Sequence, residues 1–96
     1  MPWSRIEHEV EVALRSPAHF KVLKVLLQNR SKYLTKYYIS KETGIPNPAR
    51  ILETLVRLDW VEEQTISGHT RYRINMKNPK VKALLDFFTR VGYLKY

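Results

Sequence analysis

The sequence contains no cysteine, and this absence removes several classes of protein at once. A chain without thiols holds no disulfide, no cysteine-ligated zinc and no thiol nucleophile. Long apolar runs are also missing: the longest are three residues, such as Val25–Leu27, whereas a helix that spans a membrane needs about 20. The first residues lack the charged and then apolar build of a secretory signal. We therefore expect a soluble, cytoplasmic protein with no membrane partner.

Glycine is scarce too, because the chain includes only three. Each of them is explained by a turn or a helix end, so no Gly-rich phosphate loop is present. The three histidines, His8, His19 and His69, are far apart and lack the spacing of metal ligands. These features predict that the protein is not an enzyme. We expect no metal and no cofactor, and the sequence makes no small-molecule effector evident.

Acidic residues are few, with nine Asp/Glu against seventeen Lys/Arg and a formal net charge of +8. The excess lies in blocks, because residues 16–50 carry +6, residues 51–63 carry −3 and residues 64–82 carry +5. Blocks of one sign indicate a binding face, whereas mixed signs are typical of a surface that only confers solubility. A basic face most commonly meets nucleic acid. Uneven surface charge without a partner is the alternative.

Hydrophobic periodicity and capping signals divide the chain into helices and one hairpin. A Ser-Pro or Asn-Pro pair stands at three of the helix starts, and Gly44 stands where a short helix ends. The expected helices are 4–15, 16–29, 36–43, 47–58 and 78–94, and the expected strands are 33–35, 61–66 and 71–75, with a turn at 67–70. This order predicts a single, mainly α domain over residues 1–96 with a small β-hairpin, which is an α+β class.

The spacing of apolar residues assigns an inward and an outward side to each element. The helix 16–29 is apolar over most of its circumference, which predicts the centre of the core. The acidic residues Glu7, Glu9 and Glu11 are expected on a solvated face of the first helix. In the return strand a period of two separates apolar from polar residues, namely Tyr72 and Ile74 from Arg71, Arg73 and Asn75.

Two short helices joined by a Gly-containing turn are followed by a basic hairpin. The segments are Ile39–Pro46 for the first helix and turn, Arg50–Leu58 for the second helix, and Trp60–Glu62 with Arg71–Ile74 for the hairpin. Over residues 16–76 this arrangement resembles the winged helix-turn-helix superfamily of DNA-binding regulators, of the small archaeal and bacterial MarR, ArsR and PadR type. The first and last helices are then additions to the winged-helix core. The sequence departs from the pattern of this superfamily at two points. Asp59 stands where many relatives have glycine, and the recognition segment is slightly short.

The resemblance implies a transcription regulator that binds double-stranded DNA in a sequence-specific way. The recognition helix would enter the major groove, which admits one α-helix. Arg50 can grip a guanine with two hydrogen bonds, Asn47 and Thr54 can contact bases or phosphates, and Arg57 reaches the backbone. Glu53 also belongs to this outward set, and it opposes DNA binding because phosphates repel a carboxylate that has no partner.

The resemblance also assigns the other contacts with DNA. The wing would lie on the backbone or in the minor groove with Arg71 and Arg73, and with His69 at its tip. The first helix of the motif would touch phosphates with Lys36, Tyr37 and Lys41. An alternative role for aromatic residues is stacking on single-stranded bases, by Tyr33, Tyr37, Tyr38 and Tyr72. We favour packing of Tyr38 and Tyr72 in the core, with Tyr33 and Tyr37 half-exposed.

Two other functions fit the same sequence. A chromatin-type protein that coats DNA would use the same basic face without sequence preference, and it would be associated with the nucleoid. Winged helices also serve as interaction modules in larger protein assemblies. The presence of basic residues in both the recognition segment and the wing argues against the last of these.

The last helix carries more apolar residues than one narrow stripe needs, which indicates a partner surface. We expect a homodimer whose interface is formed by Leu84, Phe87, Phe88, Val91 and Leu94. The first helix can add Trp3, Ile6, Val10 and Leu14 to that interface. The alternative is that both terminal helices cover the chain's own core.

Overall fold

The computed structural model describes residues 2–94, with side chains from His8 onward. The elements in chain order are α1 (Pro2–Ala13), α2 (Pro17–Gln28), β1 (Leu34–Thr35), α3 (Lys36–Thr43), α4 (Ala49–Arg57), β2 (Val61–Ile66), β3 (His69–Ile74) and α5 (Pro79–Arg90). The described residues thus form five helices and a three-stranded antiparallel sheet, which confirms the α+β class. None of these helices has the length and apolar character required to cross a membrane.

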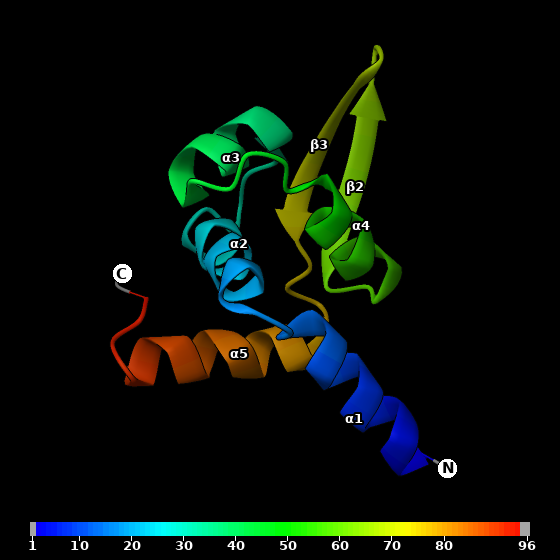
Figure 1. Cartoon of the computed structure of the whole chain (residues 1–96), viewed down its shortest axis with the longest axis vertical. Coiled ribbons are helices and arrows are strands. Elements are labelled where there is room, and N and C mark those ends of the chain that lie inside the picture. Colours follow the sequence, from blue (N-terminus) through cyan, green and yellow to red (C-terminus); the bar gives the residue numbers. More distant parts are fainter. Residues whose placement is uncertain (1, 95–96) are drawn as a thin grey trace.

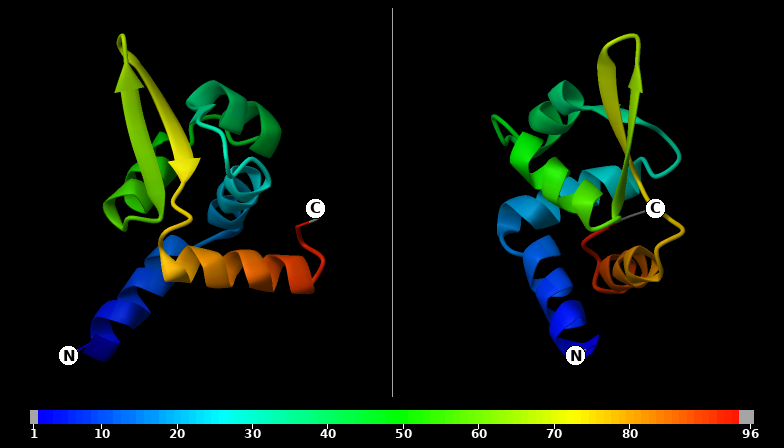
Figure 2. Two further views of the ribbon diagram at one scale, coloured as in Figure 1. Left: turned by 180° about the vertical axis from the view of Figure 1, so that it is seen from behind. Right: turned by 90° about the vertical axis from the view of Figure 1, so that its right-hand side faces the viewer.

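Helices α2, α3 and α4 gather on one side of the hairpin β2–β3, whose tip extends beyond them (Figure 1). Helix α5 runs along the opposite end of the molecule from that tip, and α1 projects away from the body. The two further views in Figure 2 show the same arrangement from behind and from the side. The principal extents are 40 × 31 × 24 Å.

Helix α2 is the centre of the core, as its apolar circumference predicts. Val22, Leu23, Leu26 and Leu27 have no exposed surface. Around them pack buried residues from every other element whose side chains are described, from Ala13 of α1 to Phe88 of α5. Burial of this apolar surface is the main favourable term in folding, at about 25 cal/mol per Å².

The segment that contains α3 and α4 agrees closely with the prediction from the sequence. Thr35 caps α3, because its hydroxyl accepts a hydrogen bond from the backbone N–H of Tyr38 at 3.1 Å. Gly44 ends α3 with a φ of +77°, a conformation that glycine adopts without a steric penalty. The start of α4 was predicted one residue too early, because Pro48 is the cap rather than the first helical residue.

The sheet has the order β1-β3-β2, so the short strand β1 pairs with the return strand of the hairpin. The predicted four-residue turn at 67–70 is wrong. The turn is only Ser67-Gly68, both with positive φ, as a tight two-residue hairpin loop requires. His69 and Thr70 consequently belong to β3 and pair with Ile66 and Thr65.

Asn75 was predicted to point outward, but it is only 7% exposed. Its side-chain amide donates to the carbonyl of Asp59 at 2.9 Å, and its side-chain oxygen accepts from the N–H of Lys77 at 3.1 Å. These bonds fix the segment around Asp59, which adopts a φ of +68°. Asp59, shortly before β2, therefore has the left-handed backbone conformation that glycine most readily adopts.

Helix α5 ends at Arg90, and the predicted extension to residue 94 is wrong. Gly92 has a φ of +80°, which reverses the chain so that Leu94 returns to the core. The reversal is held by hydrogen bonds from the N–H groups of Tyr93 and Leu94 to the carbonyl of Phe88.

This packing corrects the predicted dimer interface. Leu84, Phe88 and Leu94 are 7%, 1% and 2% exposed, so they belong to the chain's own core. Phe87 and Val91 are 56% and 59% exposed and remain available to a partner. Of the apolar residues considered on the first helix, Val10 is exposed and Leu14 packs on the core, while the side chains of Trp3 and Ile6 lie outside the described residues.

Candidate nucleic-acid interface

Helix α4 has two sharply different sides. Leu52 and Leu55 have no exposed surface and anchor the helix on the core, and the helix also packs against β2. Arg50, Glu53 and Arg57 are exposed on the other side. The helix has two different sides because apolar residues recur at helical spacing along its nine residues. The exposed side of α4 is thus held rigidly by the buried one.

Asn47 and Thr54, the other two residues predicted to contact DNA from this segment, both form hydrogen bonds with the backbone of α4 or of its start. Asn47 is exposed, and its side-chain oxygen accepts from the N–H of Ala49 at 3.2 Å. Thr54 is half-buried, and its hydroxyl donates to the carbonyl of Arg50 at 3.0 Å. Both side chains therefore already support the helix backbone, whereas Arg50 and Arg57 have no ion pair within the part of the chain that the structure describes.

Helix α3 presents its predicted residues to solvent. Lys36 and Lys41 are exposed, and the ring of Tyr37 is 74% exposed with the ammonium of Lys41 at 6.0 Å from its centre. The buried Ile39 anchors the helix on the core. Tyr38 was expected in the core, but it is 38% exposed, so α3 carries two accessible tyrosines.

The turn between α3 and α4 is fixed by side-chain hydrogen bonds. The hydroxyl of Ser40 donates to the carbonyl of Ile45 at 2.6 Å. The hydroxyl of Thr43 donates to the carbonyl of Ile39 at 2.7 Å and accepts from the N–H of Ile45 at 3.2 Å. These contacts hold the exposed sides of α3 and α4 in one fixed relation. We call the exposed basic residues of these two helices, Lys36, Lys41, Arg50 and Arg57, the α3–α4 surface.

The two arginines of the hairpin lie elsewhere, on the side of the sheet that faces away from the core. They alternate with the buried Tyr72 and Ile74, as the period of two predicts. Arg71 donates to the side-chain oxygen of Gln64 at 3.1 Å, and Arg73 forms an ion pair with Glu62 at 3.3 Å. Sequence reasoning left Tyr33 without a defined role. The guanidinium of Arg73 is 4.4 Å from the centre of its ring, and that of Arg71 is 5.9 Å away.

The opposite side of the hairpin packs on the core with Val61, Tyr72 and Ile74, and it carries one acidic residue, Glu63. Burial raises the pKa of Tyr72, and the negative charges of Glu63 on β2 and Glu53 on α4 raise it further. Tyr72 is the partner of Glu63 in the sheet and lies on the other side of it from Arg71 and Arg73. Lys36 and Lys41 lie on α3, and Arg50 and Arg57 lie on α4, the next helix along the chain. Arg71 and Arg73 lie on the other side of the sheet from α4, although Arg71 pairs with Thr35, the residue before Lys36. His69 is exposed, beside the turn at the end of the hairpin.

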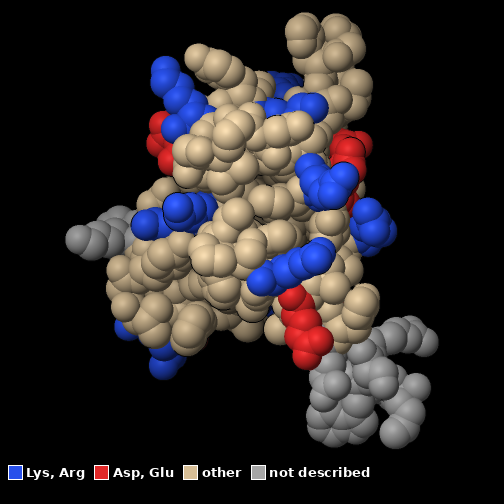
Figure 3. All heavy atoms as spheres, viewed as in Figure 1, with Lys and Arg blue, Asp and Glu red and all other residues tan. Residues whose placement is uncertain are grey.

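The space-filling view shows how the charges are distributed on the face that carries α3 and α4 (Figure 3). Lys and Arg side chains are spread over this face, and acidic side chains interrupt them at its edges. The charged side chains of this face are mostly basic, and uncharged residues separate them, so they do not form a continuous patch. At physiological salt, electrostatic interactions are screened over about 8 Å. The individual charged residues close to a ligand therefore decide what this surface binds.

One predicted solvated residue proves to be structural. The carboxylate of Glu9 on α1 accepts a hydrogen bond from the indole N–H of Trp60 at 2.7 Å and pairs with the ammonium of Lys80 at 2.7 Å. Burial acts to raise the pKa of Glu9, but the hydrogen bonds from Lys80 and Trp60 and the charge of Lys80 outweigh it, so the pKa lies below its usual value. Glu11 is exposed as expected, and the side chain of Glu7 lies outside the described residues.

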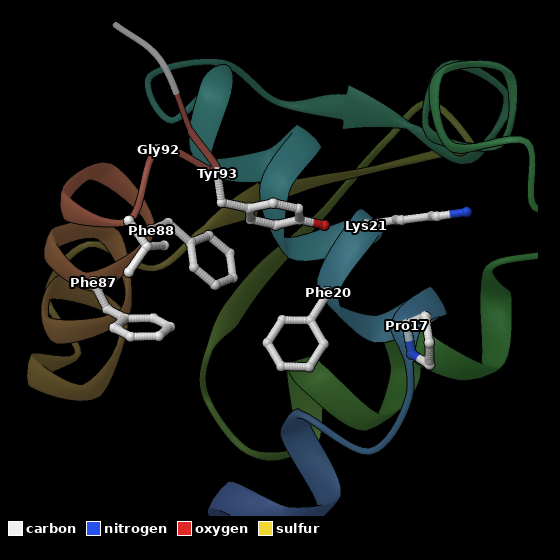
Figure 4. Close-up of a pocket in the computed structure, with 8 residues that line it drawn as sticks. Pro17, Phe20, Lys21, Phe87, Phe88, Gly92 and Tyr93 are labelled. Atoms are coloured by element: carbon white, nitrogen blue, oxygen red, sulfur yellow. The ribbon is translucent and has the colours of Figure 1, made fainter.

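An apolar hollow of about 620 Å³ lies between α2 and α5 (Figure 4). Phe20, Phe87, Phe88 and Tyr93 line it, and Lys21 stands at its edge (Figure 4). The rings of Phe20 and Phe88 are 5.9 Å apart, and those of Phe88 and Tyr93 are 4.8 Å apart. The exposed Phe87 and Val91 belong to the same patch.

Within residues 2–94, no group of three or more metal-ligating side chains is placed to hold an ion. A scan against protein-family models finds no match for this sequence, and a search of curated proteins finds no relative.

Proposed function

We propose that the protein is a winged-helix transcription regulator that binds double-stranded DNA through the α3–α4 surface. The observation that carries this proposal is the exposed side of α4, where Arg50 and Arg57 have no ion-pair partner among the described residues. Its other side is fixed on the core by Leu52 and Leu55. A rigid, basic helix surface of this size matches the width of the major groove.

The residues of this surface have different roles in the proposed complex. Arg50 lies in the first turn of α4, so it is placed to meet a guanine edge with two hydrogen bonds. Arg57 in the last turn and Lys36 and Lys41 on α3 contact phosphates, which fix the position of the helix without reading sequence. Glu53 and Glu63 oppose close approach of phosphates between α4 and the hairpin, so DNA lies against α3 and α4 more closely than against β2.

In the proposed complex, the hairpin contributes less to DNA contact than the resemblance to winged-helix regulators implies. His69 beside the turn is the hairpin residue best placed to reach the flanking backbone. Arg71 and Arg73 point away from the side that carries α4, and each already has a partner within the hairpin. We therefore propose that these two arginines add to the long-range attraction of DNA more than to direct contact.

The test is a gel-shift experiment with genomic fragments in the presence of increasing random-sequence competitor. Retention of particular fragments supports a regulator, and the salt dependence should have a slope near −3 per bound chain, because Arg57, Lys36 and Lys41 neutralise about three phosphates. Equal loss of all fragments to competitor would replace this proposal with the DNA-coating function. Absence of any binding at low salt would overturn DNA binding and leave a protein-interaction module.

We further propose that a second copy of the chain covers Phe87 and Val91, which gives a homodimer. An isologous contact needs a projection and a recess within the same patch, because each copy offers both to the other. Phe87 and Val91 lie one turn apart on α5, and the hollow between α2 and α5 is beside them. This patch therefore supplies both halves of a self-complementary contact.

A further inference from the structure

A second cavity lies at the junction of α1, α2 and α4, and its chemistry differs from that of the apolar hollow. It has a volume of about 270 Å³ and is lined by Arg15, Ser16, His19, Arg50, Ile51 and Thr54. Pockets for drug-sized ligands are typically about 300 to 1,000 Å³, so this one suits a smaller molecule. Three of its six lining residues are basic, two carry hydroxyl groups and none is acidic.

The two arginines of this cavity have no carboxylate partner within the described part of the molecule, a property that they share with Arg57. Arg73 and Arg90 are paired with carboxylates, and Arg71 is bonded to Gln64. By contrast, neither Arg15 nor Arg50 forms an ion pair or a side-chain hydrogen bond within residues 8–94. Two guanidinium groups at one cavity repel each other unless an anion lies between them. Their donors have the geometry that binds phosphate or carboxylate oxygens in pairs.

His19 adds an imidazole ring to the same wall. Its Nδ1 lies 2.9 Å from the hydroxyl oxygen of Ser16. Burial lowers the pKa of His19, and the positive charge of Arg15 lowers it further, so the ring is neutral near pH 7. A neutral ring that accepts from Ser16 at Nδ1 carries its proton on Nε2, which can donate to a ligand.

We propose that this cavity binds a small anion with a phosphate group, and that Arg15, His19 and Arg50 recognise it. The volume admits a compact phosphomonoester. The consequence for regulation rests on the proposed DNA-binding function. Arg50 is the residue assigned to the major groove, so an anion that engages it competes with DNA. The ligand is thus a negative effector, a role that the sequence alone did not indicate.

The first experiment uses the whole chain and inorganic phosphate as the probe, without DNA. Amide NMR spectra are recorded during a phosphate titration, with chloride adjusted to keep the ionic strength constant. We expect saturable shifts confined to the residues of this cavity and a Kd at least ten times weaker for Arg15→Gln. The exposed Lys82 on α5 supplies the control, because Lys82→Gln should leave the Kd unchanged. Shifts that do not saturate, or an unchanged Kd for Arg15→Gln, would overturn the site.

If Arg15→Gln does not fold, as judged by its amide spectrum, Arg50→Gln replaces it with the same expected loss. The second experiment measures DNA binding at constant ionic strength with and without phosphate. Phosphate should weaken DNA binding by the wild type several-fold and by Arg15→Gln much less. Saturable phosphate binding with no effect on DNA affinity would overturn the regulatory role. Saturable phosphate binding by a chain that binds no DNA would keep the site and overturn the proposed function.

Discussion

At the scale of single residues, Glu9 connects three elements that the sequence places far apart. It lies on α1, and its partners are Trp60, which precedes β2, and Lys80 of α5. We predict that Glu9→Ala lowers the free energy of unfolding by about 1 to 3 kcal/mol, because the indole N–H of a residue that is 2% exposed loses its acceptor. Urea unfolding at pH 7 measures this change. Glu11→Ala on the exposed side of the same helix is the control and should be near neutral.

The same contact predicts a dependence on pH. The pKa of Glu9 is lowered in the folded state, so its contribution is complete above the unfolded pKa of about 4.3. That contribution is lost as the pH falls through the lower, folded pKa. Glu9→Gln keeps an acceptor for Trp60 but cannot titrate, so the difference in stability between wild type and this variant should shrink in acid. A constant difference between pH 7 and pH 3 would show that the carboxylate charge contributes nothing.

If the proposed function is correct, the placement of Arg50 on α4 and of Arg73 on the outer side of the sheet predicts unequal roles in DNA binding. We predict that Arg50→Ala costs about 1 to 3 kcal/mol of binding to a specific fragment, the usual value for a bidentate base contact. Arg73→Ala should have a much smaller effect, because Arg73 lies on the outer side of the sheet and is paired with Glu62. Fluorescence anisotropy with one labelled fragment compares the two variants, with Lys82→Ala as a control. Equal losses for Arg50→Ala and Arg73→Ala would contradict this assignment of the surfaces.

At the scale of elements, most helix starts and ends could be predicted because their signals are local. Ser16-Pro17 and Asn78-Pro79 each precede a helix whose first residue is proline, as expected. Errors arose where tertiary contacts decide the outcome. Asn75 is buried because it bonds to Asp59, sixteen residues earlier. Leu94 leaves the helix because Gly92 reverses the chain and returns it to the core.

The candidate site was also predictable only in part, because tertiary packing decides which residues it brings together. The period of two correctly opposed Arg71 to Tyr72, but it contains no information on which side of the sheet α4 would pack. That choice places Arg71 away from α4 and brings Glu53 near Tyr72. The cavity that includes Arg15 and Arg50 depends on how α1, α2 and α4 meet, so no local pattern announces it.

Two residues with left-handed backbone should respond in opposite ways to substitution. Gly44 has a φ of +77°, and an added Cβ would meet no atom within 4 Å. Gly44→Ala should therefore cost about 1 to 2 kcal/mol through backbone strain alone. Asp59 has a φ of +68°, so Asp59→Gly should relieve strain and cost nothing or stabilise slightly. Thermal unfolding of the two variants tests the pair, and a destabilised Asp59→Gly would contradict the argument.

At the scale of the whole molecule, the length of α4 argues for two copies on DNA. Nine residues span about 14 Å at 1.5 Å per residue, which is about four base pairs. A single helix therefore reads too few positions to select a site among many competitors. A two-fold dimer through α5 presents two such helices, and the geometry matches DNA when they lie about 34 Å apart, one helical turn.

We predict that the wild type sediments at tens of micromolar with twice the mass of its 11.4 kDa chain. The double variant Phe87→Ser, Val91→Ser should sediment as one chain while keeping its fold, because both side chains are more than half exposed. Ala83→Ser on the exposed part of α5 is the matched control and should stay dimeric. The double variant should also lose affinity for a palindromic fragment while its affinity for a half-site stays the same. A wild type that sediments as a single chain at these concentrations excludes the dimer, and selection of a palindrome would then have to come from two chains that meet only on the DNA.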